Sequence, residues 1–281
     1  MKTPIFNTKE EMFRFLKENK SLLIAEKKST LKKADSINFS LPVEGKHENT
    51  YKSLDVLEIA DISTIKVSVA INTTNIMDSH SDVHIPNIWK KSLAEQKNFI
   101  LLQEHEMAFD KVISDTKNNG LTAFAKNYSW KNLGFDLEGN TQALIFEGEV
   151  SKNRNEFMFN QYAKGFVNEH SVGMQYLNLL LCMNSDSKYD IEEKANWDKY
   201  INSVVNADKA KEQGYFWAVT EAKIIEGSAV VKGSNFATPT ISISTKQTEA
   251  DIITSDKSEP QLALEAQREK QKQFLTNLLK K

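Results

Sequence analysis

Residues 165–176, GFVNEHSVGMQY, join a predicted helix to a predicted buried strand. Apolar residues recur at helical spacing from Glu156 to Val167, and the stretch from Val172 to Met183 is mostly apolar, as expected for a core strand. Ser171 is therefore expected where the helix ends and the strand begins. A serine in that place is held rigidly while its hydroxyl stays accessible, which suits a nucleophile. Most serines at such junctions are instead caps or turn residues.

A second feature upstream is an apolar run, Phe99 to Leu102, that leads to His105. Imidazole is the side chain best matched to accepting a proton from a serine hydroxyl near neutral pH. The alternative is a histidine that only faces solvent at the end of a strand. The sequence therefore indicates Ser171 and His105 as a candidate nucleophile and base.

Together these segments resemble the tailed-phage prohead protease family over roughly residues 60 to 243. The resemblance is carried by short segments in the family's order. They are Asp78 to Pro86 as an early strand and turn, Trp89 to Leu93 as a short helix, Leu-Leu-x-x-His ending at His105, Gly120-Leu121, Ser171-Val172-Gly173, and Glu226-Gly227-Ser228-Ala229-Val230 followed by Asn235.

Two positions depart from the family's usual pattern. The family has an Ile-Gly soon after the histidine, where this chain has Val112-Ile113-Ser114. Its usual Pro-Gly after the early strand is Pro86-Asn87 here.

The resemblance implies a serine endopeptidase of viral capsid maturation, with no cofactor and no metal. Its substrates would be the capsid scaffold, the major capsid protein and the enzyme itself, inside the prohead assembling in the host cytoplasm. Ser171 would be the nucleophile, His105 the base, and Gly173 would give close backbone access. The alternative is a non-catalytic adaptor that binds scaffold or shell on the same fold.

The acid that orients the imidazole is expected to be Glu226. It follows Ser171 in the chain, as the third member does in the related assemblins, and it lies on a predicted core strand that could run beside His105. Glu221 is five residues earlier and so on the opposite face of a continuous strand, although a bulge would remove that distinction.

Three other groups suggest different chemistry. His80 and His84, with Asp78 and Asp82 nearby, have the spacing of a metal pair on a helix, but the local pattern and Pro86 indicate a strand. Glu147 and Glu149 suggest hydrolysis by a pair of carboxylates. They lie on one face of a predicted strand, however, where exposed carboxylates are common. Cys182, the one cysteine, lies in an apolar run, which indicates a core position and a reducing compartment.

The fold class predicted is α+β, with many short strands in a small closed or nearly closed β-barrel flanked by helices. Residues 1–45 are expected to form a helical extension, either a pro-segment or a docking helix, beginning with a capping box at Thr8. Residues 46–243 form the core, which includes a helical insertion at 184–214. Residues 244–281 form a polar linker and a terminal helix. The insertion packs either on its own barrel or against a second copy or a substrate, so a homo-oligomer stays open.

Composition excludes some function classes. The chain has 281 residues, 40% hydrophobic and 26% charged, which is enough for one sizeable domain with extensions. Its formal net charge of -2 gives no reason to expect nucleic-acid binding. The basic run from Lys27 to Lys33 is interpreted as a solvated helix face. No apolar run approaches a membrane span and no signal peptide is visible, so no membrane partner is expected.

Overall fold

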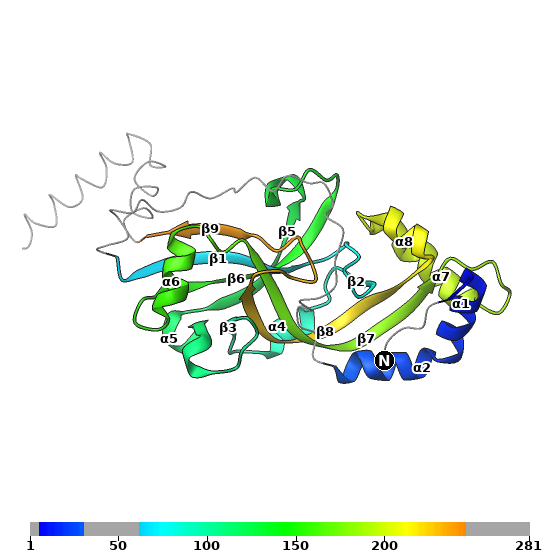
Figure 1. The fold of residues 1–281 in the computed structure, drawn as a ribbon, viewed down its shortest axis with the longest axis horizontal. Helices are drawn as coiled ribbons and strands as arrows, with labels where there is room; N and C mark the ends of the chain where they lie inside the picture. Colours follow the sequence, from blue (N-terminus) through cyan, green and yellow to red (C-terminus); the bar gives the residue numbers. More distant parts are fainter. Residues whose placement is uncertain (1–5, 31–61, 246–281) are drawn as a thin grey trace, which may run out of the picture. The chain divides into compact units, whose positions relative to one another are not determined.

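A computed structural model describes residues 6–30 and 62–245 (Figure 1). Its helices are α1 (Lys9–Glu18), α2 (Lys20–Ser29), α4 (Lys90–Glu95), α5 (Thr116–Asn119), α6 (Glu156–Ala163), α7 (Ile191–Tyr200) and α8 (Ala207–Gln213). Its strands are β1 (Thr64–Thr73), β2 (Asp82–His84), β3 (Ile100–Gln103), β4 (Val112–Asp115), β5 (Thr122–Ser129), β6 (Asn140–Ser151), β7 (Glu169–Met183), β8 (Tyr215–Val230) and β9 (Thr240–Ser244). The linker and terminal helix expected after Ser244 lie almost wholly outside the described residues.

The strands form two sheets. One has the order β5-β6-β1-β9, and the other is built on the long strand β8. One edge of β8 pairs with β7 antiparallel, from Glu169↔Val230 to Met183↔Tyr215. The other edge pairs in parallel first with β2 and then with β3, which in turn pairs with β4. The α+β prediction is confirmed, but neither sheet of the described residues closes into a barrel, so a closed barrel is not confirmed.

The segment before β9 links the two sheets. The backbone N–H of Ala70 in β1 donates to the carbonyl of Pro239 at 3.0 Å, and the N–H of His170 in β7 donates to the carbonyl of Thr238 at 3.1 Å. This segment therefore runs between β1 and the beginning of β7. Apolar side chains from both sheets, among them Ile71, Phe146 and Val219, are fully buried in one core.

The apolar runs Phe216 to Val219 and Ile224 to Val231 predict two separate short strands, whereas the structure has one continuous strand, β8. The polar residues Thr220, Glu221 and Lys223 suggested a break, but the strand continues through them because only one of its faces is covered there. The pairing of β7 with β8 is interrupted by irregularities at Gly173/Met174 and around Asn178. β4 and β9 were not predicted.

Ser171 lies inside a strand, which corrects the expected junction. α6 ends at Ala163, Gly165 takes a left-handed conformation with φ of 72°, and β7 begins at Glu169. Ser171 is therefore the third residue of β7, and its position is set by pairing with β8.

One departure from the resembled family has a clear physical basis. Asn87, where the family has glycine, adopts φ of 72°. Asparagine tolerates this left-handed region better than most other non-glycine residues, which suits it to this turn after Pro86.

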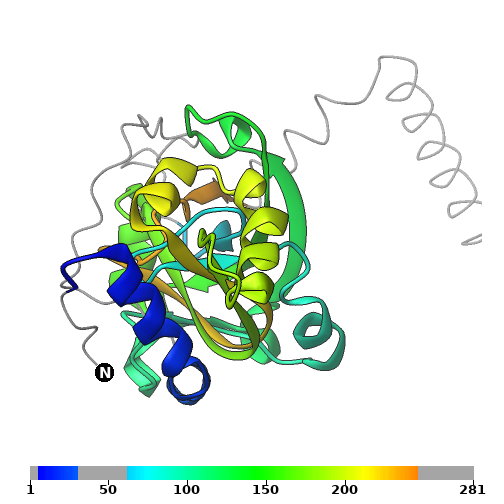
Figure 2. The same cartoon turned by 90° about the vertical axis from the view of Figure 1, so that its right-hand side faces the viewer.

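The insertion packs on its own protein. Trp197 of α7 packs against Phe216 of β8, with ring centroids 5.3 Å apart. The fully buried carboxylate of Glu193, also in α7, binds Lys17 at 2.5 Å and Lys20 at 2.7 Å. Figures 1 and 2 show α1 and α2 (blue) beside the same end of the paired strands β7 and β8 as α7.

The N-terminal helices thus belong to one compact unit with the sheets. Thr8 caps α1 as expected, by accepting from the N–H of Glu11 at 3.2 Å, but the single helix expected as far as Lys33 breaks at Asn19. Leu16 is 2% exposed and lies in the main core. No helix in the described ranges is long and apolar enough to cross a membrane.

Lys27 of α2 was interpreted as part of a solvated face, and the structure corrects this. Its ammonium group binds the carboxylate of Asp82, whose side chain is fully buried, and it also lies over the ring of Trp217, 5.7 Å from the centroid. This pair ties α2 to the beginning of β2.

Lys27→Ala is expected to lower the free energy of unfolding by about 3–5 kcal/mol, because it leaves the Asp82 carboxylate buried without its cation. Lys28→Ala on the next position of α2 is the matched control and is expected to change stability by less than about 0.5 kcal/mol. Urea denaturation of both variants measures the difference. Equal effects of the two substitutions would contradict the anchoring role of Lys27.

Candidate active site

His105 and Glu226 come together because β3 and β8 run in parallel. Leu102 pairs with Ser228, and just beyond β3 the Nδ1 atom of His105 lies 2.6 Å from Oε1 of Glu226. A carboxylate oxygen accepts in such a bond, so Nδ1 is the donor and Nε2 is the ring nitrogen that points away from Glu226. Glu226 is 1% exposed and His105 is 8% exposed, so the pair is shielded from water.

The backbone at His105 is unusual. Glu104 and His105 have φ of 53° and 59°, a left-handed conformation that non-glycine residues adopt at a cost. The N–H of Glu104 donates to the carbonyl of Ala229 at 2.9 Å, which ties this bend to β8. The bend turns the chain back so that the ring reaches Glu226 on the neighbouring strand.

Ser228 binds both members of this pair. Its hydroxyl donates to Oε2 of Glu226 at 2.6 Å and accepts from the backbone N–H of His105 at 3.2 Å. Both carboxylate oxygens of Glu226 are therefore engaged, one by the imidazole and one by the serine.

Ser171 lies across the strand pair from this cluster. It is directly opposite Ser228 in the antiparallel register, and Gly173 is opposite Glu226. Residues opposite each other in such a pair have side chains on the same face of the sheet, about 4.5–5.5 Å apart at Cβ. Of the three residues predicted from the sequence, His105 and Glu226 are joined by a hydrogen bond, and Ser171 lies on the strand paired with that of Glu226. Ser171 keeps 6% exposure, whereas Ser228 is fully buried, which favours Ser171 as the reactive hydroxyl.

Gly173 has a different role from the one expected. A Cβ atom at this position would lie 2.0 Å from Oε1 of Glu226, so the carboxylate occupies the space that a side chain would need. The glycine leaves room for the Glu226 carboxylate to lie over β7, where its Oε1 meets the imidazole of His105.

Other candidates near Ser171 are engaged elsewhere. The ring of His170 is buried, with Nδ1 3.0 Å from the carbonyl oxygen of Thr238 and Nε2 2.9 Å from the hydroxyl of Tyr162. Burial lowers the pKa of His170 to about 4. It is therefore a neutral core residue. Glu169 accepts from the N–H of Gly233 at 2.9 Å. Glu221 is partly exposed and pairs with Lys91 at 3.6 Å, away from His105.

The alternative chemistries gain no support from the geometry. Glu147 pairs with Lys66 at 3.3 Å, and its side chain is 35% exposed. Burial raises the pKa of the Cys182 thiol to about 12, so the reactive thiolate is not formed near neutral pH. His84 has both ring nitrogens in hydrogen bonds, and the described ranges hold no group of three His, Cys, Asp or Glu side chains placed to bind a metal.

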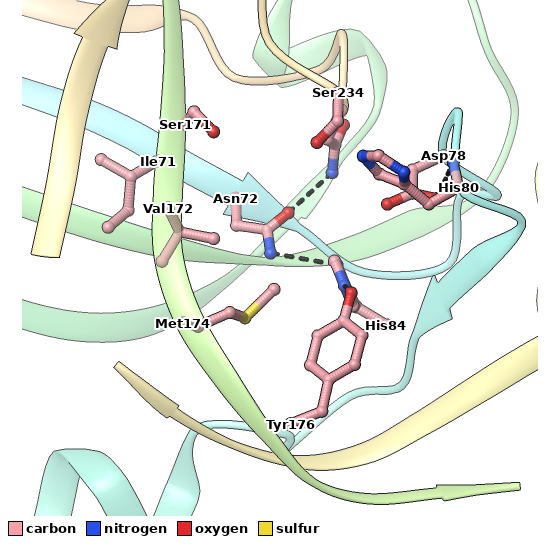
Figure 3. Close-up of a pocket in the computed structure, with 11 residues that line it drawn as sticks. Ile71, Asn72, Asp78, His80, His84, Ser171, Val172, Met174, Tyr176 and Ser234 are labelled. Atoms are coloured by element: carbon pink, nitrogen blue, oxygen red, sulfur yellow. Dashed lines mark hydrogen bonds between the residues drawn. The ribbon is translucent and has the colours of Figure 1, made fainter. Parts of the chain in front are cut away.

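His84 belongs to a buried polar chain behind Ser171 (Figure 3). Neighbouring residues of this chain are joined by hydrogen bonds of 2.8–3.0 Å, and the chain ends at Asp82, which binds Lys27. In order they are Asn235, Asn72, His84, Tyr176 and Asp82. A cavity of about 10 Å³, near the room needed by one water molecule, lies among these residues, with Ser171 and Ser234 near one end and His84 and Tyr176 near the other.

Asp78 also faces this cavity. Its Oδ1 accepts from the N–H groups of His80 at 2.8 Å and Asp82 at 2.9 Å. Burial, and next the neighbouring Asp82 carboxylate, raise the pKa of Asp78 to about 6. The turn between β1 and β2 is therefore organised by a carboxyl group that binds a proton readily.

Sequence reasoning missed the role of Ser228 and the polar chain through Tyr176. Ser228 was part of the quoted motif, but its function depends on strand pairing with Ser171 and His105, which no local pattern encodes. Met174 and Tyr176 are both buried on one face of β7, with the exposed Gln175 between them, and this period-two pattern is the signal that could have placed Tyr176 in the core.

Comparison of the chain with family models, with curated proteins and with solved structures found no match in any of the three. The likeness to prohead proteases therefore depends on the quoted segments and on the site.

Gly173→Ala is expected to lower the free energy of unfolding by about 3 kcal/mol, at the upper end of the usual cost of overpacking, because the new methyl group displaces the Glu226 carboxylate. Glu226→Ala removes the atoms that clash. The double variant is therefore expected to be more stable than the sum of the two single losses predicts. Chemical denaturation of the four proteins measures this coupling. Strictly additive losses would show that the glycine serves another purpose.

Asp78→Asn tests the raised pKa of that carboxyl group. The unfolded value is 3.8 and the folded value about 6, so the folded protein binds the proton more tightly and ionised Asp78 opposes folding at pH 7. This penalty, on the order of 3 kcal/mol, disappears as the pH falls from 6 toward 3.8. The difference in the free energy of unfolding between Asp78→Asn and wild type should therefore change between pH 6 and pH 3.8. The exposed control Asp110→Asn should not show the change, and a pH-independent difference at Asp78 would contradict the account.

Proposed function

We propose that the protein is a serine endopeptidase in which Ser171 is the nucleophile, His105 the base and Glu226 the orienting acid. The observation that carries the proposal is the buried His105–Glu226 hydrogen bond of 2.6 Å, in which Glu226 lies on the strand paired with that of Ser171. A buried carboxylate that binds Nδ1 selects the tautomer whose Nε2 can accept a proton, and this is the arrangement that serine hydrolases need.

The steps follow from these groups. The Ser171 hydroxyl oxygen attacks the scissile carbonyl carbon while Nε2 of His105 accepts the hydroxyl proton. His105 then donates this proton to the leaving amine, and the acyl-enzyme ester forms as the peptide bond breaks. A water molecule, deprotonated by the same nitrogen, attacks the ester carbonyl; the ester bond breaks, the acid product leaves, and His105 returns the proton to the Ser171 oxygen. Glu226 stabilises the imidazolium throughout without becoming protonated. Backbone N–H groups are the expected donors to the oxyanion.

The biological setting is proposed from the resemblance to prohead proteases. The substrates are the capsid scaffold, the major capsid protein and the chain itself, and the reaction takes place in the assembling prohead in the host cytoplasm. The link between the two sheets through Thr238 and Pro239 supports the nearly closed barrel that this family shares with herpesvirus assemblins.

A second candidate is a non-catalytic assembly protein that keeps the site as a structural element. It is favoured by the low exposure of Ser171 and His105, 6% and 8%, because a substrate peptide must reach both atoms. The two candidates differ in whether the purified protein cleaves anything.

Cleavage rates of site variants test the proposal. Ser171→Ala and His105→Ala are each expected to lower the rate at least about 1,000-fold, and the double variant should be little worse, because the nucleophile and base act as a unit. Glu226→Gln should retain more activity than either, since the acid only orients the ring and stabilises its charge. Initial rates on one scaffold substrate, with thermal melts to verify folding, provide the measurement.

Glu221→Gln is the matched control, because this carboxylate lies on the same strand but is partly exposed. It should remain close to wild type. Unchanged cleavage by Ser171→Ala would end the serine-protease proposal, and a wild-type protein with no cleavage of scaffold, capsid protein or itself would favour the assembly role.

A further inference from the structure

Ser228 is placed to control how the base of the proposed protease is aimed. It is fully buried, it donates to Oε2 of Glu226 at 2.6 Å, and it accepts from the backbone N–H of His105 at 3.2 Å. We propose that Ser228 is the positioning residue of this site, which holds the His105 backbone and the Glu226 carboxylate in one geometry. The inference rests on the proposed function and adds a fourth residue to it.

The first part of the argument concerns the strained bend. Consecutive left-handed conformations at Glu104 and His105 persist only if surrounding contacts determine them. Two of the contacts join backbone atoms, Glu104 N to Ala229 O at 2.9 Å and Glu106 N to Gln103 O at 3.0 Å. The contact to His105 itself is made by the Ser228 side chain. Without that hydroxyl the amide that sets the direction of the imidazole loses this acceptor.

The second part concerns the carboxylate. The terminal torsion of a glutamate side chain has broad, weakly defined minima, so a carboxylate is not oriented by its own rotamer preference. In this site Oε1 binds His105 and Oε2 binds Ser228, and the missing side chain of Gly173 leaves room for that orientation. Removing the Ser228 donor releases one of these oxygens, and the ring loses a firm partner at Nδ1.

Ser228 also connects these two effects to the nucleophile. It is directly opposite Ser171 in the β7–β8 pair, so base, acid and nucleophile are all placed relative to one residue. Ser228 does not act on the substrate itself, because it is fully buried and its proton is donated to Glu226. Its effect should therefore appear in the reactivity of Ser171 and not in substrate binding.

The experiment compares full-length wild type with Ser228→Ala, Ser228→Thr and Ser114→Ala. Ser114 is the matched control, since it is also fully buried in the same sheet and its hydroxyl has no hydrogen-bond partner among the described residues. Two quantities are measured well below each melting temperature. One is the rate at which a small alkyl fluorophosphonate modifies Ser171, and the other is the separate kcat and KM for a scaffold peptide.

Ser228→Ala is expected to slow modification and to lower kcat by about tenfold to a hundredfold, the range expected for a small displacement of a catalytic group, with KM unchanged. Ser228→Thr keeps the hydroxyl on a residue suited to a strand and should restore most of the rate. Ser114→Ala should match wild type.

Three results would contradict the inference. If wild type is modified at Ser171 and Ser228→Ala reacts equally fast, the positioning role is wrong while the proposed function stands. A change confined to KM would show that Ser228 shapes the binding surface instead. If wild type neither reacts with the reagent nor cleaves the peptide, the proposed function fails, and this inference fails with it.

Discussion

The hydrogen bond between His105 and Glu226 is the interaction on which the surrounding structure depends. A buried carboxylate is unfavourable unless its oxygens have partners, and here the imidazole and the Ser228 hydroxyl supply them at 2.6 Å each. Three further features are required for this arrangement. They are the parallel pairing of β3 with β8, the left-handed bend at Glu104 and His105, and a glycine at position 173.

Part of this site could be predicted from the sequence. Ser171 and His105 stand at the ends of apolar runs and Glu226 lies within a predicted core strand, but the resemblance to prohead proteases was needed to choose them among other residues so placed. The preference for Glu226 over Glu221 agrees with their placement, since Glu226 is 1% exposed and Glu221 is partly exposed beside Lys91. The bonds of Ser228 could not be predicted, because the register of β7 against β8 depends on irregularities that no periodicity reveals.

The fold shows the same division between local and distant information. Helix α6 follows from apolar residues at helical spacing and from its Asn155 cap, which act within a few residues. The docking of α1 and α2 does not, because Lys17 and Lys27 bind carboxylates 176 and 55 positions away along the chain. Lysines on a helix face give no indication that Glu193 and Asp82 will be buried beneath them. The continuity of β8 and the open edges of the two sheets could not be predicted from the sequence, because both depend on pairing between strands that are distant along the chain.

The most direct test of the account is proton NMR of the protein labelled with ¹⁵N-histidine. A short hydrogen bond from Nδ1 of His105 to the Glu226 carboxylate predicts a strongly downfield proton resonance, coupled to a histidine nitrogen and slow to exchange because the pair is buried. It should be present in wild type at neutral pH and disappear in Glu226→Ala, while the resonances of His84 and His170 remain. The absence of such a resonance in wild type, or its persistence in Glu226→Ala, would contradict the account.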